Sequence, residues 1–220
     1  MTKENKTMDK GAIGFAIAGL LLVIAGMASP NWLRYTGLVE NGFIKDQAFV
    51  GLWKAEFIQP GPPNELFDYF TELKFSDGKA EDPNYDWYFG SWMNACRALA
   101  ILTILWGAGT IALHFWKSFK TQNYFWSKIV FFNYIITSLF GTCAAGTWVG
   151  SIAAQELVQN ADGVEEYIWR GDYGAGLWIF WIGTGFFLPA AALAFEGGFV
   201  NHKSEQYKKL EEEFNKKIQQ

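Results

Sequence analysis

The chain has 220 residues, of which 50% are hydrophobic, 18% aromatic and 18% charged, and its formal net charge at pH 7 is −4. This apolar and aromatic content excludes a disordered or fibrous chain, and an acidic balance without a basic stripe argues against nucleic-acid binding. No Asp, Glu, Lys or Arg occurs in residues 11–29, 98–116, 129–155 and 173–195. A bilayer-spanning helix needs about 20 apolar residues. The sequence therefore predicts a membrane protein with four spans.

We expect one membrane domain over residues 1–220, mainly α: a four-transmembrane-helix bundle with a small extracellular antiparallel β-sheet from the first outer loop. An alternative for the first run is a cleaved signal peptide, because lysines precede it and small residues end it. The expected segments are an N-terminus (1–10), a first span (11–29), an outer loop with the sheet (30–94), a second span (95–116), an inner loop (117–128), a third span (129–154), a second outer loop (155–172), a fourth span (173–196) and a partly helical tail (197–220).

Charge is distributed unequally between the two sides of this arrangement. The side with both termini carries 11 basic and 7 acidic residues, whereas the outer loops carry 7 basic and 15 acidic residues. Basic residues in short loops mark the cytoplasmic side, and the inner loop 117–128 has three lysines and no acid. We therefore predict a multi-pass plasma-membrane protein with both termini cytoplasmic.

The first outer loop contains two stretches that read as strands, residues 32–36 and 49–58, because they are rich in aromatic and β-branched residues. We expect them to pair in an antiparallel sheet. An isolated hairpin is marginally stable, so the sheet is expected to rest on the bundle or on the membrane surface.

Three short motifs lie near the outer ends of the predicted spans. Trp32 is followed 21 positions later by Gly51-Leu52-Trp53, Arg97 lies in Ala95-Cys96-Arg97-Ala98-Leu99, and residues 174–181 read Gly-Ala-Gly-Leu-Trp-Ile-Phe-Trp. Together they resemble the W…GLW signature, the opening of the second helix and the start of the fourth helix in the claudin and PMP22 superfamily. The resemblance implies a claudin-like tetraspan fold in which Trp32, Gly51, Leu52, Trp53 and Arg97 have structural roles.

The chain departs from that family in its cysteines. The family has two cysteines after GLW that bridge neighbouring strands, whereas Cys96 and Cys143 are the only cysteines here and both fall in predicted helices. We expect both to be small buried hydrophobic residues. The sheet of this divergent member would then depend on the packing of Trp32 and Trp53, and Trp53→Ala would cost several kcal/mol.

Polar residues in the spans are few. Arg97 lies at the outer edge of the second span, where it is expected to snorkel or to pair with a loop acid such as Asp86. His114 and His202 have no Cys or His at metal-ligand spacing, and no nucleophile–base pair or phosphate loop occurs. We predict that the protein is not an enzyme and has no catalytic, metal or cofactor site. The absence of charge at mid-span also disfavours a transporter or pore.

Small residues recur at helix-contact spacing: Gly14 with Ala18, Gly141 with Ala145, and Gly146 with Gly150. They allow close approach of another helix, which could belong to this bundle or to another protein. Pro189 is expected to bend the fourth span. The tail after residue 199 has oppositely charged residues four apart, which favours an exposed helix that could also dock a partner.

Two functions are compatible with these features. One is a junction or adhesion protein, whose outer sheet faces the same protein or a paralogue on the next cell. The other is an auxiliary subunit of an ion channel or receptor, similar to the claudin-like subunits of glutamate receptors and calcium channels. A tetraspan membrane organiser of the PMP22 kind is a third option. The W-to-GLW spacing is closest to claudins and favours the first.

The expected partners are the lipid bilayer and other membrane proteins, with no nucleic acid and no small-molecule substrate. Four loop acids could face a partner or attract cations along a path between cells, or could form a solvated acidic surface: Glu56, Glu65, Asp68 and Glu72.

Overall fold

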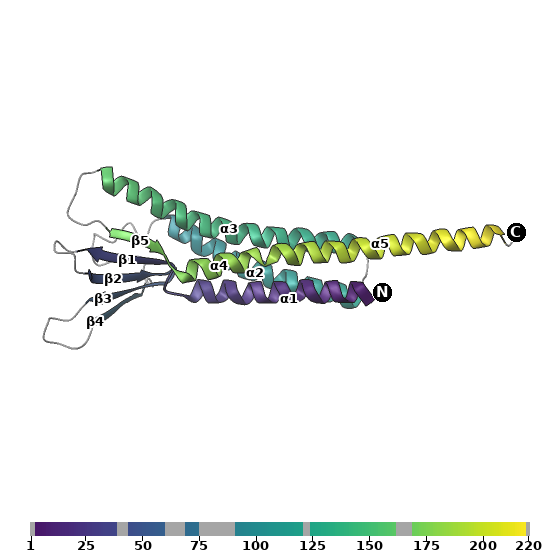
Figure 1. Cartoon of the computed structure of the whole chain (residues 1–220), viewed down its shortest axis with the longest axis horizontal. Helices are drawn as coiled ribbons and strands as arrows, with labels where there is room; N and C mark the ends of the chain where they lie inside the picture. Colours follow the sequence, from purple (N-terminus) through teal and green to yellow (C-terminus); the bar gives the residue numbers. More distant parts are fainter. Residues whose placement is uncertain are drawn as a thin grey trace.

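The computed structural model describes residues 3–38, 44–59, 69–74, 91–120, 124–161 and 169–218. These residues form an elongated helical bundle with a β-sheet at one end and both chain termini toward the other (Figure 1). We call these the sheet end and the terminal end. The helices are α1 (Lys3–Ala28), α2 (Ser91–Lys120), α3 (Tyr124–Ala161), α4 (Ala175–Gly185) and α5 (Phe187–Ile218).

Within the described residues, four helical stretches are long and apolar enough to cross a membrane, as predicted. They are Thr7–Ala28, Trp92–Phe119, Tyr124–Gly150 and Ala175–Gly198, the last of which runs through α4 into α5. Helix α2 packs against α3, and α1 packs against both α4 and α5. By length and composition, the chain is a multi-pass membrane protein.

The fourth span is interrupted at one residue, Phe186. Its backbone stays close to helical values (φ −65°, ψ −21°), and its N–H donates to the Ile182 and Gly183 carbonyls. Pro189 lies in the first turn of α5 and has no N–H for the carbonyl of Gly185, four residues before it. The helix is thus interrupted three residues before Pro189, and the bend expected at Pro189 stays a prediction.

Among the residues that the structure describes, the sheet has five antiparallel strands in the order β4-β3-β2-β1-β5. The first outer loop supplies β1 (Leu33–Leu38), β2 (Ile44–Val50), β3 (Lys54–Gln59) and β4 (Tyr69–Lys74), and the segment before α4 supplies β5 (Trp169–Tyr173). An antiparallel sheet was expected, but one strand over residues 49–58 is wrong. That stretch turns at Gly51-Leu52-Trp53, so its two halves belong to β2 and β3, which pair with each other.

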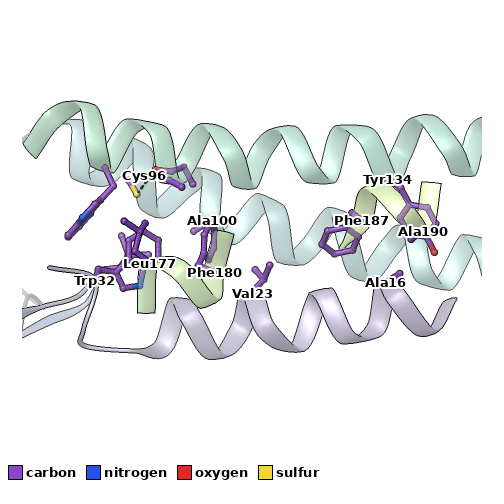
Figure 2. Close-up of a cluster of buried hydrophobic side chains, with 14 of the residues drawn as sticks. Ala16, Val23, Trp32, Cys96, Ala100, Tyr134, Leu177, Phe180, Phe187 and Ala190 are labelled. Atoms are coloured by element: carbon purple, nitrogen blue, oxygen red, sulfur yellow. Dashed lines mark hydrogen bonds between the residues drawn. The ribbon is translucent and has the colours of Figure 1, made fainter. Parts of the chain in front are cut away.

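The core of the bundle is lined by buried apolar side chains along its length. Figure 2 shows Trp32, Leu177 and Phe180 toward the sheet end, and Tyr134 and Phe187 nearer the terminal end. Cys96 is buried as predicted, and its Sγ donates to the Ala144 carbonyl oxygen at 3.2 Å. Cys143 is exposed, so the prediction of a buried residue is wrong there. Both thiols are free.

Helix α1 packs closely against α4 at Gly26. A Cβ at this position would lie 2.5 Å from the backbone nitrogen of Phe180 and 2.7 Å from its Cα. Backbone atoms cannot move aside as a flexible side chain can. Gly14 on the same helix has no heavy atom within 4 Å of such a Cβ.

Gly26→Ala should therefore lower the free energy of unfolding by about 1–3 kcal/mol through overpacking. Gly14→Ala is the matched control and should leave stability unchanged or raise it by up to about 1 kcal/mol, because alanine favours helix. Thermal unfolding of both variants in detergent micelles measures the difference. Equal melting temperatures would contradict the close helix contact.

Candidate functional site

Trp32 links the sheet to the bundle. Its backbone N–H donates to Val50 O of β2 (2.9 Å), and its carbonyl accepts from Gly174 N–H at the start of α4 (2.9 Å). Its indole Nε1–H donates to Gly26 O of α1 at 2.6 Å. The fully buried ring lies 5.3 Å from the Trp148 ring of α3 and 5.0 Å from Phe180. One side chain and its peptide group thus hold three helices and the sheet together.

The corner between β2 and β3 rests on the end of the bundle. Gly51 is required there because a Cβ would lie 2.6 Å from the Ser29 carbonyl oxygen and 2.7 Å from Pro30 Cα. Leu52 is fully buried. The sequence motif therefore marks the point where the loop contacts α1 and the residues that follow it.

Arg97 of α2 fixes the same corner from the opposite side. Its Nε donates to the Leu52 carbonyl at 2.8 Å, and its guanidinium carbon lies 5.5 Å from the centroid of the Trp53 ring, in a cation–π contact. Its Nη1 also donates to Asn94 at 3.4 Å. The expected partner Asp86 lies outside the described residues. Arg97 therefore holds the sheet through a carbonyl and a ring.

The role expected of Trp53 needs correction. Its side chain is 40% exposed, so it does not anchor the sheet by burial as Trp32 does. Instead, one face of the ring is the surface over which Arg97 lies. The five motif residues do lie at the contact between sheet and bundle, but the motif does not indicate which of its tryptophans is buried.

Of the four predicted partner-facing or cation-attracting acids, two lie in the described strands. Glu56 of β3 and Glu72 of β4 are directly opposite each other in the antiparallel register. Glu65 and Asp68 lie outside the described residues.

The two tryptophans should respond differently to truncation. Trp32→Ala removes a fully buried ring and a hydrogen bond, and should destabilise the protein by about 3–5 kcal/mol. Trp53→Ala should cost much less, because its ring is partly in contact with solvent or lipid. Limited proteolysis of the outer loop and thermal unfolding of both variants provide the test. Equal losses would show that burial does not separate their roles.

A second cluster of polar side chains lies at the terminal end, which we call the Asp9 network: Asp9 of α1, His114 and Lys117 of α2, and Tyr134 of α3. All four are buried, Asp9 with 5% exposure. Asp9 Oδ1 accepts from Lys117 Nζ at 3.0 Å and lies 3.1 Å from His114 Nε2, while His114 Nδ1 lies 3.0 Å from the Tyr134 hydroxyl.

A neutral imidazole satisfies every bond in the Asp9 network. Nε2–H then donates to Asp9, and Nδ1 accepts from the Tyr134 hydroxyl. Asp9 and Lys117 cancel each other's charge. Gly197 of α5 covers the cluster, because a Cβ there would lie 3.6 Å from Asp9 Oδ1. The network therefore joins three spans by hydrogen bonds and touches the fourth.

This network is not indicated by the sequence motifs. Asp9 and Lys117 entered only the count of charges on the side with both termini, and His114 was noted only for having no Cys or His at metal-ligand spacing. The spacing of His114 and Lys117, three residues apart, places both on one face of α2 and was the available signal. Within the residues that the structure describes, no group of three or more His, Cys, Asp or Glu could hold a metal ion.

Removing one partner of the buried ion pair should destabilise the protein. Asp9→Asn leaves the Lys117 charge buried without a counter-charge and should cost about 3–5 kcal/mol of stability. Adding Lys117→Met should recover most of that loss, because the asparagine oxygen still accepts from His114. Thermal unfolding of the single and double variants tests this coupling. A double variant with the summed losses of the two single variants would contradict it.

The small residues of the spans divide into two groups. A Cβ at Gly141 would overlap the Thr184 side chain, and Ala145 is buried, so this pair packs inside the bundle. Gly14, Gly146 and Gly150 have open space around the Cβ position. Together with exposed Cys143, Gly146 and Gly150 form a small-residue face on the outside of α3.

Comparison with protein-family profiles returns no match for the sequence, and a search of curated proteins also returns none.

Proposed function

We propose that this chain is a claudin-like integral membrane interaction protein that acts in cell–cell junctions or adhesion through its sheet. The proposal rests on one observation: the sheet is held firmly against the end of a bundle of membrane-spanning helices. Trp32 joins β2 to α1 and α4, and Arg97 joins the β2–β3 corner to α2. A domain fixed in this way can transmit a force or a defined orientation between a partner and the membrane.

The orientation in the proposal follows from charge. Both termini lie toward the end opposite the sheet (Figure 1), and the segments at that end carry the excess of basic residues. The positive-inside tendency then assigns the terminal end to the cytoplasm and the sheet to the outside of the plasma membrane. The motif resemblance to claudins supports the same arrangement.

The acidic residues suggest what the sheet would attract. Glu56 and Glu72 occupy opposite positions of β3 and β4, and ten acids lie between Glu40 and Asp86. In a lateral assembly between cells, such charge would attract cations and repel anions, and salt would weaken the effect.

Expression in cells without junctions tests adhesion. The tagged protein should concentrate at contacts between two expressing cells, and remain uniform where an expressing cell meets a non-expressing one. Gly14→Ala serves as a folded control that should behave as the wild type. Surface-expressed protein with no enrichment at shared contacts would reject the adhesion proposal.

The alternative is an auxiliary subunit of a channel or receptor, and the small-residue face on α3 favours it. Gly146 and Gly150 leave room for a foreign helix to approach closely within the membrane. Purification from the native membrane in mild detergent should then recover a channel or receptor subunit near 1:1. Gly146→Leu should abolish that recovery with little loss of stability, because a Cβ at this position has no heavy atom of this bundle within 4 Å. Recovery of only this protein or its paralogues would reject the alternative.

A further inference from the structure

Helix α5 carries an apolar stripe that no part of the described bundle covers. Tyr207, Leu210 and Phe214 are 69%, 61% and 65% exposed. The C-terminal part of α5, drawn in yellow, extends past the other helices (Figure 1). We call these three residues the tail stripe.

Lipid does not account for the tail stripe. The fourth candidate span ends at Gly198, and Tyr207 follows nine residues later. At about 1.5 Å per residue, the stripe begins roughly 13 Å beyond the end of the span along the helix axis. The headgroup region on one side of a bilayer is only about 5–8 Å deep. Because α5 continues the span as one helix, the stripe is carried away from the membrane.

The spacing of the stripe is that of a coiled-coil seam. Tyr207, Leu210 and Phe214 are three and four residues apart, which places them at successive a, d and a positions of a heptad. Lys208 and Glu212 fall at outer positions of the same heptad. The preceding and following d positions are Lys203 and Lys217, so the seam is limited to three apolar layers.

We propose that the tail stripe pairs with the tail stripe of a second copy of this chain, in a parallel coiled coil. Two copies inserted in one membrane in the same direction hold their stripes parallel and at the same height. In a parallel coiled coil, the g position of one copy faces the next e position of the other. Gln206 at g therefore faces Glu211 at e, which pairs an amide donor with a carboxylate. Glu213 at g faces position 218, an isoleucine. These e and g positions therefore oppose no like charges, whereas the lysines at the adjoining d positions would face each other and so end the seam.

Confinement to a membrane supplies the rest of the stability that the pairing needs. A three-layer seam is too short to hold two free peptides together, since isolated helices of this length are marginal. Two chains in one bilayer meet at a high effective concentration without loss of orientation. The pairing needs no ligand at the sheet, so it is independent of the proposed function.

Disulfide cross-linking of the full chain in proteoliposomes tests the pairing. In a Cys143→Ser background, where only buried Cys96 remains, Leu210→Cys places a thiol in the seam and Glu212→Cys places one on the outer side of the same turn. Mild oxidation should give a roughly fivefold higher dimer fraction for Leu210→Cys. Adding Tyr207→Lys and Phe214→Lys should reduce that fraction to the Glu212→Cys level.

Three results would overturn the proposal. Equal dimer fractions at positions 210 and 212 would show random collision, and cross-linking that survives the two lysine substitutions would show that the stripe does not form the seam. A photoreactive group at position 210 in native membranes gives an independent measurement. Capture of a different protein with no self cross-link would assign the stripe to that partner and refute self-pairing. Unchanged tryptophan fluorescence of each variant verifies that the bundle is intact.

Discussion

The structure depends on the position of Trp32 between the sheet and the bundle. Its peptide group joins β2 to the start of α4, and its indole is hydrogen-bonded to the last turn of α1 while it packs against rings of α3 and α4. A Cβ at position 26 or 51 would lie too close to neighbouring backbone atoms, which explains the glycines there. Both cysteines of the described residues are free, so the sheet is held to the helices by the contacts of Trp32 and Arg97 and not by a disulfide.

The spans were predictable because the requirement for about 20 uncharged residues is local in sequence. The strands were only partly predictable. Residues 49–58 have strand composition throughout, and the turn at Gly51 follows from the contact of the corner with Pro30, which no local pattern reveals. Strand β5 lies more than 130 residues from its partner β1. Its pairing is a tertiary event, and a short segment such as Trp169–Tyr173 has no periodicity that would predict it.

The site at Arg97 and the Asp9 network also differ in how far a local sequence pattern predicts them. Arg97 was identified because a motif carries it, although its carbonyl acceptor in Leu52 was not foreseen. Asp9 and His114 are 105 residues apart, and a charge at the end of an apolar run is usually solvated. Here Asp9 begins the buried face of α1 that continues through Ala12 and Ala16. The ion pair and the aromatic cluster thus secure opposite ends of the bundle by different chemistry.

The strand order also determines when the sheet can be completed during synthesis. Strands β1 to β4 precede the second span, but β1 must wait for β5, which is translated after the third span. At about 5–20 residues per second, the gap between Leu38 and Trp169 corresponds to a delay on the order of ten seconds. During that interval one edge of β1 has unpaired backbone groups, a template for pairing with another nascent chain. Pairing of β5 with this edge of β1 is therefore the last step that completes the sheet during synthesis.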